Sequence, residues 1–510
     1  MYNNATLNDP PPTYLLIVGD IAQVPSFSGN SGSHVSDLYY CEFDGNGDFY
    51  PEMYYGRFSG NTILEIENQV DKTLNYEKYL FPNTSFLNDM VLVAGVDAAY
   101  APTYGNGQIN YATDNYFNLA HNLNINNYLY GSGTPITSNM PQASANIISN
   151  VSEGTSLANY TAHCGSNGWA DPDFNTNDVA SLQNNDEYGL VISNCCLPNK
   201  FDEPTCFGEA LLRAEDKGAV GHIGASNNTY WDEDYWWSVG NTSNISANPT
   251  YSATGLGAYD CWMHENGEHK DDWFITQAQI LHAGNLAVTE AGGAEEYYWE
   301  IYHLMGDPSL MPYVGVPTVL NVTHNSILPI GATTFTVNTE ENSYVAISIN
   351  GILLDAKLCD VSGVVNLNFN PISNVGTVDI VVTKQFKQPY INTIQAISPN
   401  GPYVNVTNNI ISDISGNNNS LADYSEIIDL DVDLFNLGGG NSQNLNLLLS
   451  SSDPYITILD SMESVGAINS NQTLTTNNAF SFQVADFVPD QHLALFQLII
   501  SDLQGNTWNS

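Results

Sequence analysis

Basic residues are scarce in this chain. Its 510 residues include 10 Lys and Arg against 55 Asp and Glu, which gives a formal net charge of −45 at pH 7. Because a phosphate backbone is bound through a basic surface, this balance argues against a nucleic-acid partner. Such acidity is typical of a protein that stays soluble in a saline or extracellular setting.

Long apolar runs and ordered cysteine patterns are also missing. No stretch of about 18 apolar residues predicts a membrane span. The start, MYNNATLNDPPPTYLLIVGD, has no basic region followed by an apolar core, so no signal peptide is visible. Seven cysteines stand without zinc-site spacing or a CxxC redox motif. We expect no organic cofactor, and we expect that the chain is a fragment of a longer precursor.

The first part of the chain has the pattern of an α/β protein. At about 100–200 residues per domain, its length suits three or four domains. Uninterrupted apolar runs at 14–18 and 90–95 predict strands covered on both faces, and helices are predicted at 62–80 and 295–304. The alternation predicts a mostly parallel sheet flanked by helices. We assign an N-terminal α/β subdomain to residues 1–88, truncated at its start, and a second subdomain to residues 89–314.

The character of the sequence changes after Pro312. Short segments of alternating polarity, such as TTFTVNT and TVDIVVT, recur about every 10 residues and predict an immunoglobulin-like β-sandwich over residues 315–396. Residues 397–510 repeat the β pattern and form a predicted β-rich C-terminal domain. Because the pattern runs to the last residues, we expect truncation there as well.

A cysteine and a histidine are predicted at the ends of neighbouring strands. The run at 190–192 leads to Cys195 and Cys196, and the extended segment at 158–161 leads to His163. Catalytic groups gather at the carboxyl ends of parallel strands, and a thiolate nucleophile needs an imidazole beside it. Asp97, at a third strand end, is a candidate to orient that imidazole. From spacing alone, a buried inert cysteine and a structural histidine remain alternatives.

The loop at 44–52 offers oxygen ligands between glycines. Asp48 and Glu52, together with Asp20 after the first strand, have the carboxylates that Ca²⁺ prefers. A simple Gly/Asn turn between strands explains the loop equally well. We predict a structural Ca²⁺ ion with Asp20, Asp48 and Glu52 as the ligands to test.

Four long segments carry a family resemblance. ANYTAHCGSNGWADP, ISNCCLPNKFDEPTCFGEALLRAEDKGAVGHIGASNNTYWDEDYWWSVG, LHAGNLAV and YYWEIYHLMGDPSLMPY resemble the gingipain-type cysteine peptidases, most of all those specific for lysine. The resemblance extends from about Tyr14 to Pro402. It implies a caspase-like α/β catalytic domain followed by an immunoglobulin-like domain. It also implies a bacterial protein that is secreted or on the cell surface, with an inhibitory propeptide missing from this chain.

The resemblance assigns catalytic roles to particular positions. It places the nucleophile on Cys196, the catalytic histidine on His163 and the orienting acid on Asp97, and it leaves Cys195 as a pocket wall. The oxyanion is expected to be held by the backbone N–H groups of Cys164 and Cys196. The family usually has Gly where this chain has Cys164. That residue keeps its N–H, but its side chain can narrow the site or add an oxidisable thiol.

The resemblance also places the substrate pocket on Thr161, Asn194, Trp231 and Asp234. An Asp at the base of a pocket with a Trp wall suits a lysine ammonium, through charge and cation–π contact. Two alternatives remain open from the residues. The tryptophans in YWDEDYWW also suit plain core packing, and the adjacent Asp232 and Glu233 compete with Asp234 for the acidic role.

Together these patterns predict a secreted cysteine endopeptidase. It would cleave protein substrates through a Cys/His dyad and a thioester acyl-enzyme, with preference for Lys at P1. A scarcity of internal basic residues suits an enzyme that cuts after them. The alternatives are a weak or inactive surface adhesin with a peptidase-like scaffold, and a calcium-dependent binding module built on the loop at 44–52.

Overall fold

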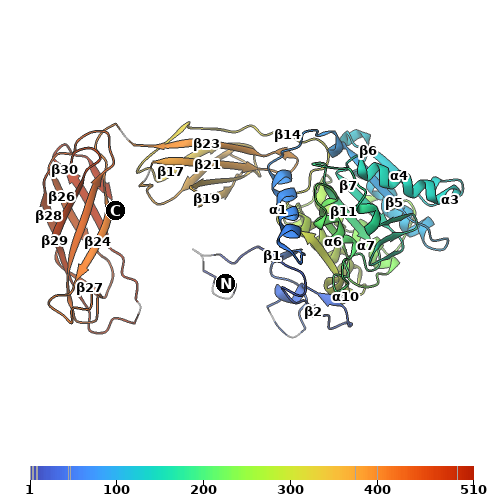
Figure 1. The fold of residues 1–510 in the computed structure, drawn as a ribbon, viewed down its shortest axis with the longest axis horizontal. Helices are drawn as coiled ribbons and strands as arrows, with labels where there is room; N and C mark the ends of the chain where they lie inside the picture. The colour runs from blue at the N-terminus through green and yellow to red at the C-terminus, as the bar shows by residue number, and fades with distance from the viewer. Residues whose placement is uncertain are drawn as a thin grey trace. The chain divides into compact units, whose positions relative to one another are not determined.

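The computed structural model describes residues 2, 5–6, 10–43, 45, 47–373, 375–398, 400–490 and 492–509. The chain divides into two compact units. The first comprises Met1–Val319 and Gln385–Pro389, and the second comprises Leu320–Lys384 and Tyr390–Ser510. The first unit mixes helices and strands, whereas the described part of the second is built of strands (Figure 1).

Eight strands of the first unit form one sheet. They are β1 (Tyr14–Val18), β4 (Tyr54–Phe58), β5 (Asp89–Ala94), β6 (Asn124–Tyr128), β7 (Leu157–Thr161), β11 (Gly189–Asn194), β12 (Ala219–Ala225) and β13 (Tyr302–Gly306). Their order is β1-β4-β13-β12-β11-β7-β5-β6. The described neighbours are parallel except β12 and β13, which are antiparallel. The predicted mostly parallel α/β sheet is confirmed, and strands from both predicted subdomains belong to it.

Two apolar cores cover the two faces of this sheet. In β5, Met90 and Leu92 belong to one core, and Val91 and Val93 belong to the other. The first core includes side chains of α2 (Asn106–Asn115), α7 (Trp231–Val239), α8 (Ala258–Met263) and α9 (Gln277–Ala291). The second includes side chains of α4 (Met140–Ser152) and α6 (Phe207–Arg213). This burial on both faces explains the uninterrupted apolar runs in the sequence.

The helix predictions hold at one position and fail at another. The predicted helix at 62–80 is α1 (Ile63–Glu77), which begins after Thr62 with a capping box between Thr62 and Glu65. The helix predicted at 295–304 is wrong over its last residues, because α10 (Glu295–Ile301) is followed directly by strand β13. All five residues of β13 are buried between neighbouring strands, so sheet pairing overrides the local helical pattern.

The second unit contains two groups of strands. The first group has a three-stranded sheet of β15 (Thr323–His324), β17 (Thr334–Asn338) and β20 (Val364–Asn368). Its five-stranded sheet contains β16 (Ile327–Pro329), β18 (Tyr344–Ile349), β19 (Ile352–Leu358), β21 (Gly376–Thr383) and β23 (Tyr390–Ile397). Their inward side chains share one apolar core, as expected for an immunoglobulin-like sandwich.

The last part of the chain forms two four-stranded sheets. One contains β24 (Val404–Ser412), β25 (Ile427–Asn436), β27 (Ile456–Asp460) and β29 (Thr473–Val484). The other contains β26 (Leu445–Ser450), β28 (Met462–Val465), β30 (Gln497–Asp502) and β31 (Thr507–Asn509). The predicted fold class, α/β followed by β-rich regions, is confirmed. The boundaries after residues 88, 314 and 396 stay predictions.

Candidate active site

Three neighbouring strands bring the predicted dyad and its acid together. The strands β11, β7 and β5 are parallel, and Asn194 of β11 and Ala94 of β5 both lie in register with Thr161 of β7. Cys196 and His163 each follow their strand by two residues, and Asp97 follows its strand by three. The three side chains therefore lie on adjacent segments at the carboxyl edge of the sheet, the order being thiol, imidazole and carboxylate.

His163 is paired with Asp97. The His163 Nε2 and Asp97 Oδ2 atoms are 2.9 Å apart, and the imidazole is half exposed. The other Asp97 oxygen accepts hydrogen bonds from the backbone N–H groups of Ala99 (2.8 Å) and Tyr100 (2.9 Å). Burial alone would raise the pKa of Asp97, but these bonds and the His163 contact lower it. Because Nε2 is engaged by a carboxylate, Nδ1 is the ring nitrogen left for a reacting group.

Cys196 is a free thiol held from one side by Thr229. The Thr229 backbone N–H donates to the Cys196 sulfur at 3.3 Å, and the thiol is partly buried. Burial raises the pKa of the Cys196 thiol, the charge of Asp234 adds to the rise, and the Thr229 hydrogen bond opposes it. A thiol with a raised pKa needs a base to become a nucleophile at neutral pH, which is a role that suits His163.

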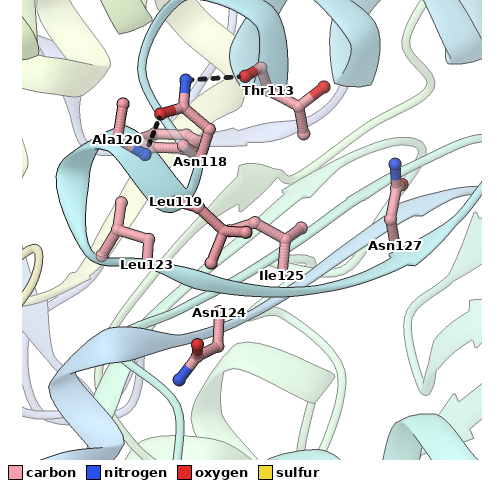
Figure 2. A pocket seen from close by; sticks show the side chains of 9 residues that line it. Thr113, Asn118, Leu119, Ala120, Leu123, Asn124, Ile125 and Asn127 are labelled. Carbon is pink, nitrogen blue, oxygen red and sulfur yellow. Dashed lines mark hydrogen bonds between the residues drawn. The ribbon is translucent and has the colours of Figure 1, made fainter.

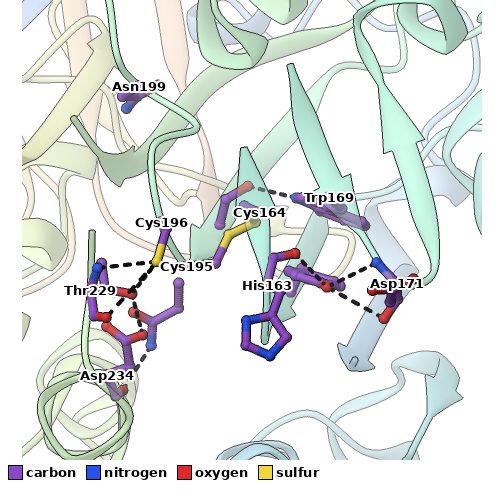
Figure 3. The surroundings of a disulfide bond; sticks show 12 residues. His163, Cys164, Trp169, Asp171, Cys195, Cys196, Asn199, Thr229 and Asp234 are labelled. Carbon is purple, nitrogen blue, oxygen red and sulfur yellow. Dashed lines mark hydrogen bonds between the residues drawn. A yellow bond between two sulfur atoms is a disulfide. The ribbon is translucent and has the colours of Figure 1, made fainter. Parts of the chain in front are cut away.

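A disulfide joins the two segments that carry the dyad. Cys164, directly after His163, is bonded to Cys195, directly before Cys196, and the two Cα atoms are 5.5 Å apart. Figure 3 shows this bond between the Cys196 and His163 segments. Sequence reasoning missed it and treated Cys195 as a pocket wall. The clue in the sequence was Cys164, at a position where the resemblance leads us to expect Gly, on the strand predicted to neighbour the one that carries Cys195 and Cys196.

Asp234 is a buried acid beside the nucleophile. Its Oδ1 accepts hydrogen bonds from the hydroxyls of Tyr298 (2.9 Å) and Tyr302 (3.0 Å), and its Oδ2 accepts one from Thr229 (2.7 Å). Burial raises the pKa of Asp234 to about 7, against the effect of these three bonds. Among the described residues, no Lys, Arg or His forms an ion pair with Asp234.

Asn194 and Thr161 belong to the same buried network. The Asn194 amide donates to the Asp234 carbonyl at 2.7 Å and to Gln108 at 3.0 Å, and Tyr302 donates to the Asn194 side-chain oxygen. Gln108 in turn donates to the Thr161 hydroxyl at 3.1 Å. The structure thus brings Thr161, Asn194 and Asp234 of the predicted pocket together, and it adds Gln108 and Tyr302, whose positions far away in the sequence gave no signal.

The three adjacent acids of helix α7 lie in different surroundings. Asp232 is exposed, and Glu233 accepts a hydrogen bond from the Ala294 N–H at 3.1 Å, so Asp234 alone of the three is buried in the network. Its place in the first turn is favourable, because a helix N-terminus stabilises negative charge.

The tryptophans of α7 also lie in different surroundings. Trp231 stacks on Tyr100, with ring centroids 5.5 Å apart, and meets the His163 ring edge-on at 5.8 Å. Trp237 is fully buried against Tyr302, as core packing requires. Trp231 is therefore the tryptophan of this helix that stands beside the dyad.

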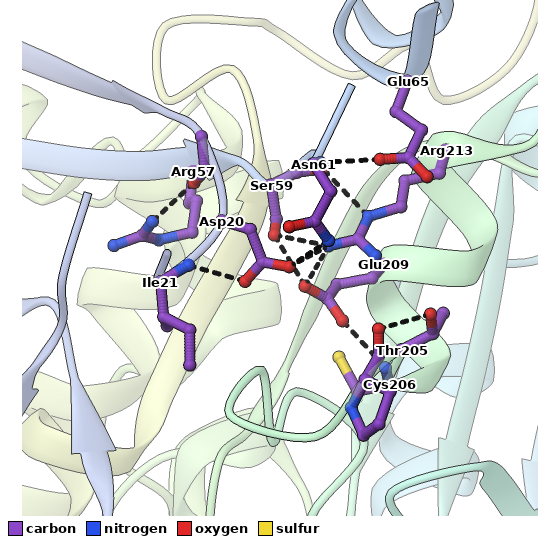
Figure 4. Close-up of polar contacts among 12 residues, drawn as sticks. Asp20, Ile21, Arg57, Ser59, Asn61, Glu65, Thr205, Cys206, Glu209 and Arg213 are labelled. Atoms are coloured by element: carbon purple, nitrogen blue, oxygen red, sulfur yellow. Dashed lines mark hydrogen bonds and ion pairs between the residues drawn. The ribbon is translucent and has the colours of Figure 1, made fainter. Parts of the chain in front are cut away.

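The predicted calcium ligands are not assembled. Asp20 follows the carboxyl end of β1, whereas Glu52 comes just before β4, which runs parallel to β1 with Tyr14 in register with Tyr54, so the two residues lie at opposite ends of these strands. Asp20 is bonded to Arg213 and Asn61, at 2.9 and 2.6 Å (Figure 4). Asp48 accepts from the Tyr50 N–H, and Glu52 accepts from the Phe43 N–H.

No group of three His, Cys, Asp or Glu side chains that suits a metal occurs in the described part of the chain. Asp44 and Asn46 of the predicted loop lie outside the described residues. The described donors do not fit a calcium ion together, and calcium stays a prediction.

A hollow of about 800 Å³ lies elsewhere on the first unit. Thr113, Asn118, Leu119 and Asn124 are among the residues that line it, as Figure 2 shows. Asn124 begins β6 and pairs with Asp89, the first residue of β5, so the hollow lies at the amino ends of these strands. The dyad lies at the carboxyl ends, and this hollow is not part of its site.

Comparisons with known proteins agree with this fold. A family model described as peptidase family C25 matches residues 1–313. Lys-gingipain of Porphyromonas gingivalis is 37% identical over 416 residues, which cover 80% of this chain and 23% of that protein. Gingipain R1 of the same organism is 26% identical over 406 residues, which cover 78% of this chain and 38% of that protein. The chain thus spans about a quarter of the length of Lys-gingipain.

Two solved structures of peptidases are also similar to this chain. One named "Structure of Protease" has a TM-score of 0.71 and 36% identity, and the match covers 78% of this chain and 85% of that one. The Arg-specific cysteine proteinase gingipain R has a TM-score of 0.63 at 22% identity, with 77% and 85% covered. This second likeness supports the fold alone.

Proposed function

This chain belongs to peptidase family C25, and on that premise we propose that it is a cysteine endopeptidase acting on protein substrates. The observation that carries the proposal is the His163–Asp97 pair at the end of β7, beside the strand end that carries the free Cys196. The acid orients the imidazole, and the imidazole has one nitrogen left to exchange protons with the thiol.

The reaction proceeds in two stages. His163 Nδ1 takes the proton of Cys196, and the thiolate attacks the scissile carbonyl. Backbone N–H groups of Cys164 and Cys196 hold the oxyanion. The imidazolium then gives its proton to the leaving amine, the C–N bond breaks, and a thioester remains. In the second stage His163 takes a proton from water as the oxygen attacks the thioester. The C–S bond then breaks, the acid product leaves, and the imidazolium returns its proton to the Cys196 thiolate.

The buried acid supports a preference for lysine at P1. Asp234 is 4% exposed and has three hydrogen bonds but no ion pair with a cation of the described chain. A substrate ammonium supplies the missing positive charge in a site that excludes water, where such pairing is strong. Trp231, three residues before Asp234 in α7, adds an aromatic face beside the dyad. The name of Lys-gingipain, the relative at 37% identity, accords with this preference.

A cleavage profile on a peptide library tests the proposed function. The protein is incubated with a library that varies P1, and mass spectrometry reads the cleaved bonds. We expect at least about 10²-fold preference for Lys over Ala or Glu, since an unpaired buried acid discriminates strongly against a substrate that lacks the ammonium. Cleavage after small or acidic residues would contradict the pocket, and a complete lack of cleavage would contradict the activity.

The setting of the enzyme is part of the proposal. The protein is secreted or exposed at a cell surface, in line with its net charge of −45 and with a disulfide, which persists in oxidising compartments. No helix among the residues described above is long and apolar enough to cross a membrane. An inhibitory propeptide is proposed by likeness to gingipain RgpB, whose pro- and mature domains are known as a complex.

A structural calcium ion near residues 44–52 is a separate part of the proposal. It rests on the oxygen-rich composition of the loop and not on an assembled set of ligands. If the ion binds, EGTA lowers the midpoint of thermal unfolding, and added Ca²⁺ restores it. An unchanged midpoint of thermal unfolding in EGTA, measured by calorimetry, would contradict a structural calcium ion.

A further inference from the structure

Ordered sheet pairing stops before the dyad. The last register pair of β7 and β11 is Thr161 with Asn194, and both catalytic residues come after it. Beyond that pair, no hydrogen bond of the described chain links residues 162–165 to residues 195–197. The Cys164–Cys195 disulfide spans this gap.

The other contacts hold each catalytic segment to different surroundings. The His163 carbonyl accepts from the Ala170 N–H at 3.0 Å and from the Tyr160 hydroxyl at 2.9 Å, both on its own side of the gap. Cys196 is held through Thr229, which follows β12. Neither set of hydrogen bonds joins the imidazole to the thiol. Two other contacts cross the gap: the edge-on contact of the Trp231 ring with the His163 ring, and the covalent bond between the sequence neighbours of the two catalytic residues.

We propose that the Cys164–Cys195 disulfide is a positioning cross-link for the dyad. The inference rests on the proposed function and deepens it. Cys164 is the neighbour of His163, and Cys195 is the neighbour of Cys196, so each half of the link is one peptide unit from a reacting side chain. The two proposed oxyanion donors are the amides of Cys164 and Cys196, and the link fixes both. Proton transfer and attack depend on such placement to within about 1 Å.

The cross-link gives the enzyme a particular dependence on redox conditions. Cys196 must be a thiol, while the disulfide beside it must stay oxidised. An added dithiol at high concentration breaks the Cys164–Cys195 bond, leaves two thiols and is itself converted to a disulfide. Activity is therefore highest under mild reduction, which keeps Cys196 free without opening the cross-link.

The test replaces both bonded cysteines. In the Cys164→Ala/Cys195→Ala variant the cross-link is gone, and no new thiol stands beside Cys196. We expect kcat on a lysyl peptide to fall by about 10–100-fold while KM changes by less than about 3-fold. The matched control, Cys359→Ala, removes a buried free cysteine of the second unit and retains wild-type kcat.

Two further readouts separate positioning from mere stability. The rate of Cys196 alkylation by iodoacetamide, followed against pH, reports the coupling of the thiol to His163. We expect its low-pH shoulder to shrink in the double variant. In the wild type, reduction of the disulfide lowers kcat by the same factor, and reoxidation restores it, so the test does not depend on the folding of the variant.

The outcomes show which proposal fails, the positioning role of the disulfide or the peptidase activity. A lower thermal midpoint with unchanged kcat and an unchanged alkylation profile overturns the positioning role, as does peptide mapping that finds Cys164 and Cys195 unbonded. A wild-type protein that cleaves no peptide contradicts the peptidase proposal instead. The alkylation profile of Cys196 then still decides whether the disulfide orders the dyad.

Discussion

Replacing Cys196 by alanine lowers kcat on a lysyl peptide by at least about 10⁴-fold, because the covalent route through a thioester is lost. No neighbouring thiol can take over, since Cys195 and Cys164 are bonded to each other. The measurement is a steady-state assay on purified protein, with circular dichroism to show that the fold is retained.

The matched control for this variant is Cys41→Ala. Cys41 is a buried free cysteine of the same unit, packed with Leu38 and Tyr55. We expect its kcat to stay within about 3-fold of the wild type. If the Cys196 variant kept activity within about tenfold of the wild type, the nucleophile would be a different residue.

Replacing Asp234 by asparagine lowers kcat/KM for lysyl substrates by about 10²–10³-fold. The substrate ammonium then enters a buried site without its negative partner, and an uncompensated charge away from water is costly. Because Asp234 also accepts from Tyr298 and Tyr302, the thermal midpoint is measured beside the kinetics. Asp232→Asn is the control, since that exposed carboxylate is two residues away, and its kcat/KM stays within about 3-fold.

The pH dependence of kcat/KM is an independent test of the role of Asp234. Burial raises the pKa of Asp234 to about 7 in the free protein, so the carboxyl is neutral below that pH and charged above it. The lysine ammonium keeps its charge up to about pH 10. The kcat/KM for lysyl peptides, divided by the rate of Cys196 alkylation, therefore rises with pH through about 7. A ratio that is flat from about pH 5 to 9 would rule out Asp234 as the binding acid.

Local patterns carry much of the fold. The apolar runs of β5 and β11 indicate strands buried on both faces, and Thr62 with Glu65 indicates the start of α1. The strand ends then place His163 and Cys196 on neighbouring segments. Here the sequence suffices because the information is local and the topology follows common rules.

The remaining features of the fold and of the site depend on contacts between residues that are distant in the sequence. Such contacts cannot be predicted from local sequence patterns. Asp20 has the composition of a metal ligand, but it pairs with Arg213, which lies 193 positions away. Gln108 joins Thr161 to Asn194 only after α2 packs against the sheet. The disulfide needed the β7–β11 pairing before its two cysteines were known to be neighbours.

An affinity label locates the nucleophile and the proposed lysine site in one experiment. A lysyl chloromethylketone combines the P1 group of the proposed substrate with an electrophile for the nucleophile, and tryptic mass spectrometry locates the adduct. We expect one adduct per chain, on Cys196, which is lost in Cys196→Ala and formed at least about 10²-fold more slowly in Asp234→Asn. Labelling of another residue, or equal labelling by an alanyl chloromethylketone, would contradict it.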